Sequence, residues 1–410
     1  MPHDNATAAS ALKQLRRHYF TWGWMLPALL PLLQIAGRAA FHIVGVIYLI
    51  WALASLYGCK LYIERRVLLP YLLMMVVFLA SVLAAGTGWD GIHSWLDFVL
   101  YSCISLIMLA SLPFVGDDGR ARLLTLIGIV GIVAVIILYL ALPLQVSHPG
   151  FIPRTSMRAD NLPLLTPFAL YLLQYQWRHP RRQLIAAIFL VAVVVYVIGS
   201  ETRATLAALI IALAFYAVAV MRLRLRTAAA MAIVILLLAG AAVGDVLIRG
   251  AERFHSVTEF LDVASSGRTQ LWRQALQSPP ANIWLGVGLG TLKRETGSEV
   301  LQLKFGDQSG TVKHLHNFLL DCWYETGFVG AGALLLWLGT LGYAALRRLR
   351  TADGAARSRV AVLLSAAAAI LVDASLTHSY GSKQFATYLF LFLVLAATDT
   401  PRINPNTFRA

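Results

Sequence analysis

The sequence predicts an all-α fold, a polytopic membrane helical bundle of about twelve transmembrane helices with one large loop on the non-cytoplasmic side. Three observations predict it. The 410 residues are 59% hydrophobic and only 13% charged, whereas soluble domains are about a quarter charged. The mean hydropathy is +0.70. Apolar runs recur along nearly the whole chain, and most can cross roughly 30 Å of hydrocarbon as a helix. A membrane β-barrel needs short alternating segments instead.

The chain divides into three parts by this reading. Residues 1–247 hold a polar N-terminal tail, retained before a signal anchor, and helices one to nine. Residues 248–315 form the large outer loop with short amphipathic helices, and residues 316–410 hold helices ten to twelve and a C-terminal tail. The predicted spans are 21–36, 39–57, 67–85, 92–112, 121–142, 162–177, 183–199, 204–221, 227–247, 316–346, 359–379 and 383–398.

The positive charge fixes the orientation. A net charge of +14 is common in nucleic-acid-binding proteins, but here the basic residues form short clusters between apolar runs. With the N-terminus inside, twenty-one of the 34 lysines and arginines fall on the cytoplasmic side and five in the short outer loops. Cytoplasmic loops carry such an excess. Both termini are therefore predicted to be cytoplasmic, with membrane lipids and no nucleic acid as partners.

No cofactor or metal motif is evident. Cys59, Cys103 and Cys322 have neither disulfide nor metal spacing. The glycine-rich segment 286–290 lacks the strand–helix unit of a dinucleotide site. It is predicted to be a compact loop whose backbone approaches the bundle.

The large outer loop contains a predicted amphipathic helix. Ser265 or Ser266 caps it, and it runs to Gln277 before two prolines. Its apolar face suits the membrane surface or the bundle and consists of Leu271, Trp272, Ala275 and Leu276. A second such helix is predicted over residues 249–261.

Four outer arginines are not needed to set the topology: Arg203, Arg268, Arg154 and Arg158. Each alone is explained as an interfacial anchor for lipid headgroups. Together they form a site for a polyanion, since a guanidinium binds phosphate oxygens bidentately.

Two histidines lie where the large loop re-enters the membrane, His314 and His316. At this spacing they do not share a helical face, which argues against zinc. They are either an interfacial pair or include a general base, since imidazole titrates near neutral pH. Four polar residues within spans, Asp321, Glu325, Asp373 and His378, either form a proton path or pair with the arginines around an external cavity.

The ordered set of motifs resembles the O-antigen ligase and polymerase superfamily of bacterial membrane glycosyltransferases. The matching elements are Ser200-Glu-Thr-Arg203, Ser266-Gly-Arg268 with Trp272, Gly286-Val-Gly-Leu-Gly290, and His316-Asn-Phe-Leu319 followed by Glu325, Gly327 and Gly330. One departure is Ala204, where relatives often carry glycine. The motifs cover about residues 180–340, and length and topology look most like an O-antigen ligase.

The resemblance implies a function at the periplasmic face of the bacterial inner membrane. The donor would be O-antigen on undecaprenyl diphosphate, the acceptor a sugar of lipid A–core, and the product lipopolysaccharide. Catalytic residues would be His316 as base with Arg203 and Arg268. Arg203, Arg268, Arg154 and Arg158 would bind the diphosphate, with His314, Asn317 and Glu325 in support. No carboxylate pair is evident for a double displacement, so single displacement with inversion, independent of metal, is expected.

Other functions remain open. An O-antigen polymerase or a protein O-oligosaccharyltransferase shares the architecture. A lipid or solute transporter suits twelve spans, but the commonest carriers divide six plus six around a cytoplasmic loop. A scaffold leaves the arginines and histidines unexplained.

Overall fold

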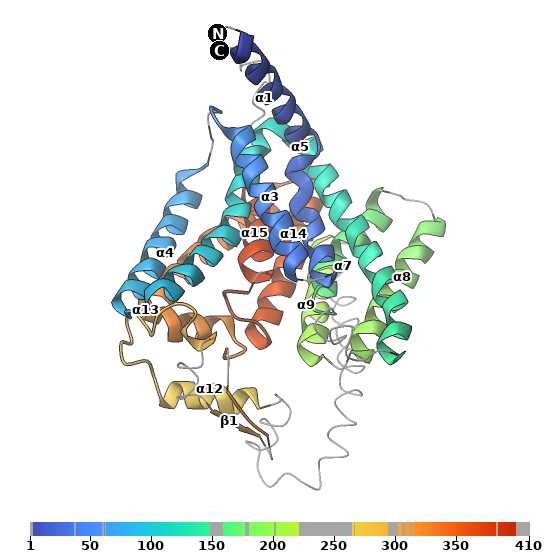
Figure 1. Ribbon diagram of the computed structural model, residues 1–410. Helices are drawn as coiled ribbons and strands as arrows, with labels where there is room; N and C mark the ends of the chain where they lie inside the picture. The colour runs from blue at the N-terminus through green and yellow to red at the C-terminus, as the bar shows by residue number, and fades with distance from the viewer. Residues whose placement is uncertain are drawn as a thin grey trace.

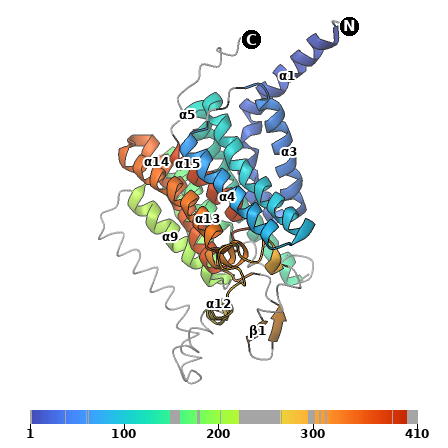
Figure 2. The same cartoon turned by 90° about the vertical axis from the view of Figure 1, so that its left-hand side faces the viewer.

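The computed structural model describes residues 3–36, 38–59, 61, 63–147, 159–176, 180–200, 202–220, 265, 267–293, 302–305, 308–311, 314–382 and 384–398. They form a helical bundle with two opposite ends (Figures 1 and 2). One end carries α1 (His3–Thr21). The other carries the short helix α12 (Arg268–Gln277) and an antiparallel hairpin of β1 (Gln302–Phe305) and β2 (Gln308–Thr311). We call these the α1 end and the α12 end.

The helices follow the predicted spans closely. Eleven of the twelve predicted spans coincide with helical segments, and the remaining one, 227–247, lies outside the described residues. The segments are η1 (Gly23–Leu29), α2 (Leu30–Ala36), α3 (Arg38–Leu56), α4 (Arg65–Ala84), α5 (Gly88–Ser147), α7 (Leu162–Tyr171), η2 (Leu172–Gln176), α8 (Pro180–Gly199), α9 (Arg203–Ala219), α13 (Phe318–Thr351), α14 (Gly354–Leu376), η5 (Gln384–Leu389) and α15 (Phe390–Ala397).

Five helices in the described part of the chain are long and apolar enough to cross a membrane: α3, α4, α5, α13 and α14. The other apolar helices there are 10–17 residues long. The outward faces agree with a lipid environment. Ile43, Ile47 and Ile50 form an exposed apolar stripe along α3, and Leu69, Leu72 and Val76 form one along α4. Soluble proteins rarely expose apolar surface on this scale.

Two of the long helices contain a break at a glycine. In α5 the break is at Gly116 (φ 64°, ψ −165°), between the two spans predicted there. In α13 it is at Gly327 (φ 66°, ψ −172°). Positive φ is costly for residues with a Cβ, so glycine is the residue that permits each break.

The predicted polar N-terminal tail is a helix in the structure. Residues of α1 are helical, and the helix ends inside the bundle, where the Tyr19 hydroxyl lies 2.8 Å from Ser111 and 3.3 Å from Tyr48. Because Tyr19 is fully buried, the end of α1 is anchored against α3 and α5.

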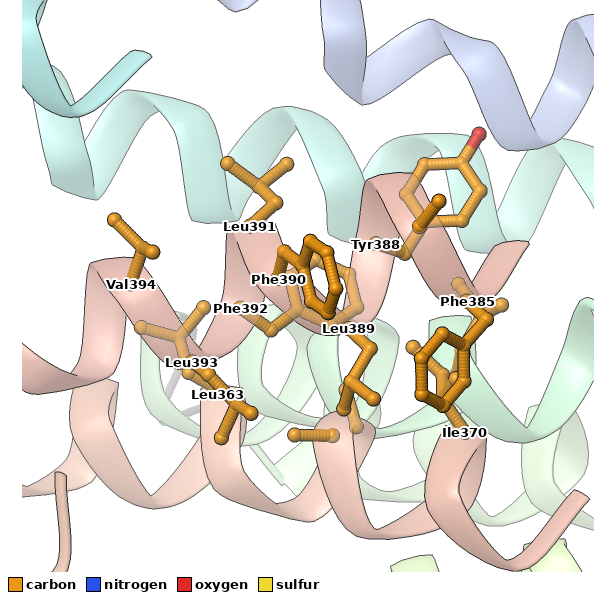
Figure 3. Close-up of a cluster of buried hydrophobic side chains, with 14 of the residues drawn as sticks. Leu363, Ile370, Phe385, Tyr388, Leu389, Phe390, Leu391, Phe392, Leu393 and Val394 are labelled. Atoms are coloured by element: carbon orange, nitrogen blue, oxygen red, sulfur yellow. The ribbon is translucent and has the colours of Figure 1, made fainter. Parts of the chain in front are cut away.

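The core of the bundle centres on α15 and the π-helix η5 that precedes it. Phe385, Leu389 and Phe390 are fully buried. Figure 3 shows Phe385 beside Ile370 of α14 and Leu393 of α15 beside Leu363 of α14. Next to this core, α9 and α14 pack through small residues: Ala208, Ala212 and Ala369 form one buried cluster. Small side chains let two helices approach closely in a membrane. This close packing brings the first residues of α9 beside the end of α14 at the α12 end.

Candidate active site

Five chain segments meet at the α12 end: residues 160–161 before α7, the start of α9, the start of α12, residues 314–317 before α13, and residues 377–380 after α14. They bring together three residues that the sequence singled out, His316, Arg203 and Arg268. The charge of Arg203 acts on Arg268, and the charge of Arg268 acts on His316.

His316 is held in one orientation. Its Nδ1 donates a hydrogen bond to the carbonyl oxygen of Thr377 over 3.0 Å, so in the neutral ring the acceptor nitrogen is Nε2. Among the described residues it is the one non-glycine with positive φ, 55°. Backbone strain of this kind persists where the surrounding structure over-determines it, often at functional sites.

The segment around His316 is fixed from several sides. Trp272 of α12 donates its indole N–H to the Leu315 carbonyl over 2.8 Å, and the Leu315 N–H donates to Asp321 Oδ1 over 2.6 Å. Asn317 caps α13 by accepting from the backbone of Leu319 and Leu320. Its amide also donates to the Ser375 carbonyl over 3.1 Å. The segment is therefore tied to α12, α13 and α14 at once.

Electrostatics favour the neutral form of His316. Burial lowers its pKa from the ordinary value, the bond to Thr377 opposes this, and the charges of Arg268 and His378 lower it further. His314 lies close by, with ring centroids 4.1 Å apart. The hydrogen bond to Thr377, however, belongs to His316, which gives a physical reason to distinguish the two rings.

Arg268 and Arg203 begin two different helices. Arg268 is the first residue of α12, after Gly267 with φ 80°, and Ser265 Oγ accepts from the Thr269 N–H over 3.1 Å. The Ser265 hydroxyl therefore bonds the first turn of α12, but the N-cap residue is Gly267 instead of the predicted Ser265 or Ser266. Burial lowers the pKa of Arg268; the carboxylates of Asp373 and Asp160 raise it, and the charge of Arg203 lowers it. An arginine nevertheless stays protonated, so two guanidinium charges lie at this end of the bundle, and that of Arg268 acts on His316.

An acidic pair lies beside these cations, joined by His378. His378 Nε2 is 3.0 Å from Asp373 and 3.5 Å from Asp160. Thr377 donates its hydroxyl to Asp373 over 2.7 Å, and Thr205 donates to Asp160 over 2.8 Å. We call Asp160, Asp373 and His378 the carboxylate–histidine cluster. It corrects the expectation that the site lacks a carboxylate pair.

The carboxylate–histidine cluster carries a charged imidazole. Burial alone would lower the pKa of His378, but Asp373 and Asp160 outweigh it and raise the pKa to about 10. A recess of about 200 Å³ lies beside the two carboxylates, otherwise lined by Pro163, Leu164, Ala369 and Ile370. The charge of Asp373 also acts on Arg268 and raises its pKa, and the ion pair that Asp373 forms is with His378.

The cluster also has the side chains of a divalent-cation site, since its ligand atoms lie within 4.8 Å of one another. Carboxylates suit magnesium or manganese, and imidazole suits zinc. A histidine can bind a metal only when it is neutral. The protonated His378 that its carboxylates favour therefore opposes metal binding.

Glu325 is a structural carboxylate in this arrangement. It is 5% exposed, and it accepts from the Leu292 N–H over 3.1 Å and from the Tyr380 hydroxyl over 2.6 Å. It thus ties α13 to the loop after α12 and to the segment after His378.

The glycine-rich segment packs on the break in α13, backbone against backbone. The Gly288 N–H donates to the Glu325 carbonyl over 2.8 Å, and the Phe328 N–H donates to the Ile283 carbonyl over 2.9 Å. A Cβ on Gly286 would lie 2.4 Å from the Glu325 carbonyl carbon. This confirms the prediction of a compact loop that approaches the bundle.

Several predicted positions lie outside the described residues: Arg154, Arg158, Glu201, Ser266 and the helix over 249–261. On α12, Leu271 and Ala275 are fully buried as predicted, but Leu276 is 61% exposed. Asp160, Thr205 and Thr377 were not predicted. The sequence signal for Asp160 was its place in the polar segment before a span, and only the fold pairs it with Asp373.

One known protein family is similar to part of the chain. Residues 186–338 match the model of the O-antigen ligase family. This segment of the chain is therefore similar to the O-antigen ligase family. The matched segment includes Arg203, Arg268 and His316, whereas Asp160, Asp373 and His378 lie outside it. No curated protein matches the chain.

Proposed function

We propose that this protein is an O-antigen ligase that transfers a glycan from undecaprenyl diphosphate to a sugar hydroxyl of lipid A–core. The observation that carries the proposal is the convergence of a neutral, oriented His316 with Arg203 and Arg268 at one end of a membrane bundle. Transfer to a hydroxyl needs a base, and departure of a lipid diphosphate needs positive charge. Both are present at this end.

His316 is the proposed general base. Its Nε2 takes the proton of the acceptor hydroxyl while the hydroxyl oxygen attacks the anomeric carbon of the donor. The hydrogen bond from Nδ1 to Thr377 keeps Nε2 as the acceptor atom and stabilises the ring once it is protonated. A positioned base of this kind contributes roughly 10²–10⁴-fold in rate.

Arg203 and Arg268 are the proposed diphosphate ligands, with Arg154 and Arg158 as further candidates. As the new glycosidic bond forms, the bond from the anomeric carbon to the diphosphate oxygen breaks, and undecaprenyl diphosphate leaves as an anion. Two guanidinium groups stabilise the charge that develops on it. The leaving group needs no proton, so the site needs no general acid.

Inversion at the anomeric carbon is proposed on the basis of how the carboxylates are held. A retaining mechanism needs a carboxylate that attacks the sugar. Asp373 and Asp160 each accept a threonine hydroxyl and pair with the His378 imidazolium. These contacts lower their nucleophilicity, so direct attack by the acceptor hydroxyl is favoured.

The proposed location is the bacterial inner membrane, with both termini cytoplasmic and the site facing the periplasm. Arg120, Arg348 and Arg359 line a recess between α5, α13, α14 and α15. The carbonyls that end α15 accept from Arg120 and Arg348, which places this basic region at the end of α15 away from η5. The excess of basic residues marks the cytoplasmic side of a membrane protein.

The test is a transfer reaction with purified protein in detergent, undecaprenyl-diphosphate-linked O-antigen and lipid A–core. The ligase proposal predicts a ladder of glycan on lipid A–core, and inverted stereochemistry at the new linkage. Longer lipid-linked glycans without transfer to lipid A–core would instead assign a polymerase. Retained stereochemistry would overturn the single displacement.

A further inference from the structure

The α1 end of the bundle contains a second basic site, remote from His316. Here α5, α13, α14 and α15 enclose a recess of about 320 Å³, part of it open to the outside. Its lining consists of Arg120, Leu123 and Leu124 of α5, Arg348 of α13, Ala356, Arg359, Val360 and Leu363 of α14, and Leu395 of α15. Among these described residues, three are arginines, six are apolar and none is acidic.

Two of the arginines are held by the end of α15. Arg120 is 6% exposed and donates to the Thr398 carbonyl over 2.8 Å. Arg348 donates to the same carbonyl and to that of Leu395 over 3.3 Å. A cation is favourable at a helix C-terminus, so these bonds stabilise α15. They also fix two guanidinium groups beside one recess.

The third arginine, Arg359, enters the recess from α14. Its Nη2 lies 4.0 Å from Asp117, whose side chain is 64% exposed, while Arg359 itself is 20% exposed. A pair with so exposed a carboxylate is weak. Arg120 and Arg348 stabilise the end of α15, but Arg359 has no such role. The charge of Arg359 in the recess therefore needs another explanation.

The lining has the chemistry of an amphiphile site. A guanidinium group binds phosphate oxygens in a bidentate manner, and basic pockets between membrane helices bind lipid headgroups on the cytoplasmic side. A small free anion would gain no favourable contact from the six apolar residues. These aliphatic side chains are suited to a hydrocarbon tail that continues from the headgroup.

We propose that this recess binds an anionic phospholipid, with the phosphate between Arg359, Arg348 and Arg120 and an acyl chain against Leu123, Leu363 and their apolar neighbours. The lipid comes from the leaflet at the α1 end, the cytoplasmic leaflet in the orientation proposed above. The bound lipid contacts the ends of all four helices that line the recess, α5, α13, α14 and α15. The site is independent of the transfer reaction, and its test measures binding.

Native mass spectrometry of the full chain in detergent tests this, with phosphatidylglycerol as the probe. We expect the first phosphatidylglycerol to bind the wild type with a dissociation constant at least tenfold lower than that of further phosphatidylglycerol molecules, which bind non-specifically. Arg359→Gln removes the preference, whereas Arg350→Gln, an exposed arginine of α13 that does not line the recess, keeps it. Equal binding in wild type and Arg359→Gln would overturn the site.

A second variant acts in the opposite direction and keeps the basic lining intact. Asp117→Asn removes the exposed carboxylate beside Arg359, so phosphatidylglycerol binds severalfold more tightly; unchanged or weaker binding contradicts the proposal. Inorganic phosphate and phosphatidylcholine separate the sources of the ligand. Competition by millimolar phosphate that displaces the lipid completely would assign a free-anion site instead, and equal binding of phosphatidylcholine would overturn the requirement for net negative charge.

Discussion

The Nδ1 atom of His316 lies 3.0 Å from the carbonyl oxygen of Thr377. The Thr377 hydroxyl in turn donates to Asp373, and the neighbouring His378 pairs with the same carboxylate. Asp373 therefore fixes the turn that orients His316, although it does not contact the ring that we propose as the base. The position of His316 thus depends on Asp373, which is 57 positions further along the chain. The two residues are close because α14 packs beside α13 and α9.

The pH dependence of transfer follows from the environment of His316. Burial and neighbouring positive charge lower its pKa, so the neutral, basic form persists below the ordinary pKa of about 6.5. We expect the single-turnover rate to be constant from about pH 7 to 9 and to fall only on the acid side, with an apparent pKa below 6.5. A rate that rises steadily through pH 8 would contradict a lowered pKa for the base.

Charge at the start of α12 is expected to control donor affinity. Arg268→Ala removes a guanidinium near the reacting groups, and loss of one hydrogen bond to a charged group costs roughly 1.5–3 kcal/mol. Binding of undecaprenyl diphosphate should weaken by about tenfold or more. Arg273→Ala is the matched control, because Arg273 is an exposed arginine of the same helix. Equal effects of both variants would show that only net charge matters.

Removal of metal ions is expected to leave transfer unchanged. His378 between Asp373 and Asp160 is held in its protonated form, which does not ligate a metal. Activity assayed in excess EDTA should equal that of the untreated enzyme. If EDTA abolishes activity and a divalent cation restores it, the carboxylate–histidine cluster becomes the candidate metal site, and Asp160→Asn should then abolish the restoration.

The break in α13 is expected to be indispensable for stability. In Gly327→Ala the new Cβ would lie 2.1 Å from the Trp284 carbonyl carbon, at φ 66°. With ψ −172°, this backbone conformation is essentially restricted to glycine and costs another residue roughly 1–3 kcal/mol, and the clash adds to it. Thermal unfolding in detergent should shift to clearly lower temperature. Gly332→Ala, in the same helix with nothing within 4 Å of its new Cβ, should have little effect; similar shifts in both would refute the packing argument.

Local patterns in the sequence were sufficient to predict the helices and some of the residues of the site. Apolar runs predicted the helical segments, because each run must satisfy its own backbone in a membrane. Arg203 and Arg268 were predicted because charges at outer helix ends need an explanation, whereas His316 was chosen over His314 from the family resemblance. The pairing of Asp160 with His378 was not predictable, since it depends on how α7, α9 and α14 pack. The β1–β2 hairpin and the helical form of α1 were also not predicted, because neither segment has a clear periodic pattern of apolar residues.

The most direct test of the proposed function compares three proteins in one transfer reaction. Wild type, His316→Ala and Arg203→Lys are incubated with undecaprenyl-diphosphate-linked O-antigen and lipid A–core, and donor binding is measured in parallel. The account predicts rapid transfer by wild type only. His316→Ala should bind the donor normally and transfer roughly 10²–10⁴-fold more slowly, while Arg203→Lys should lose both binding and rate. Full activity of His316→Ala would contradict the central claim.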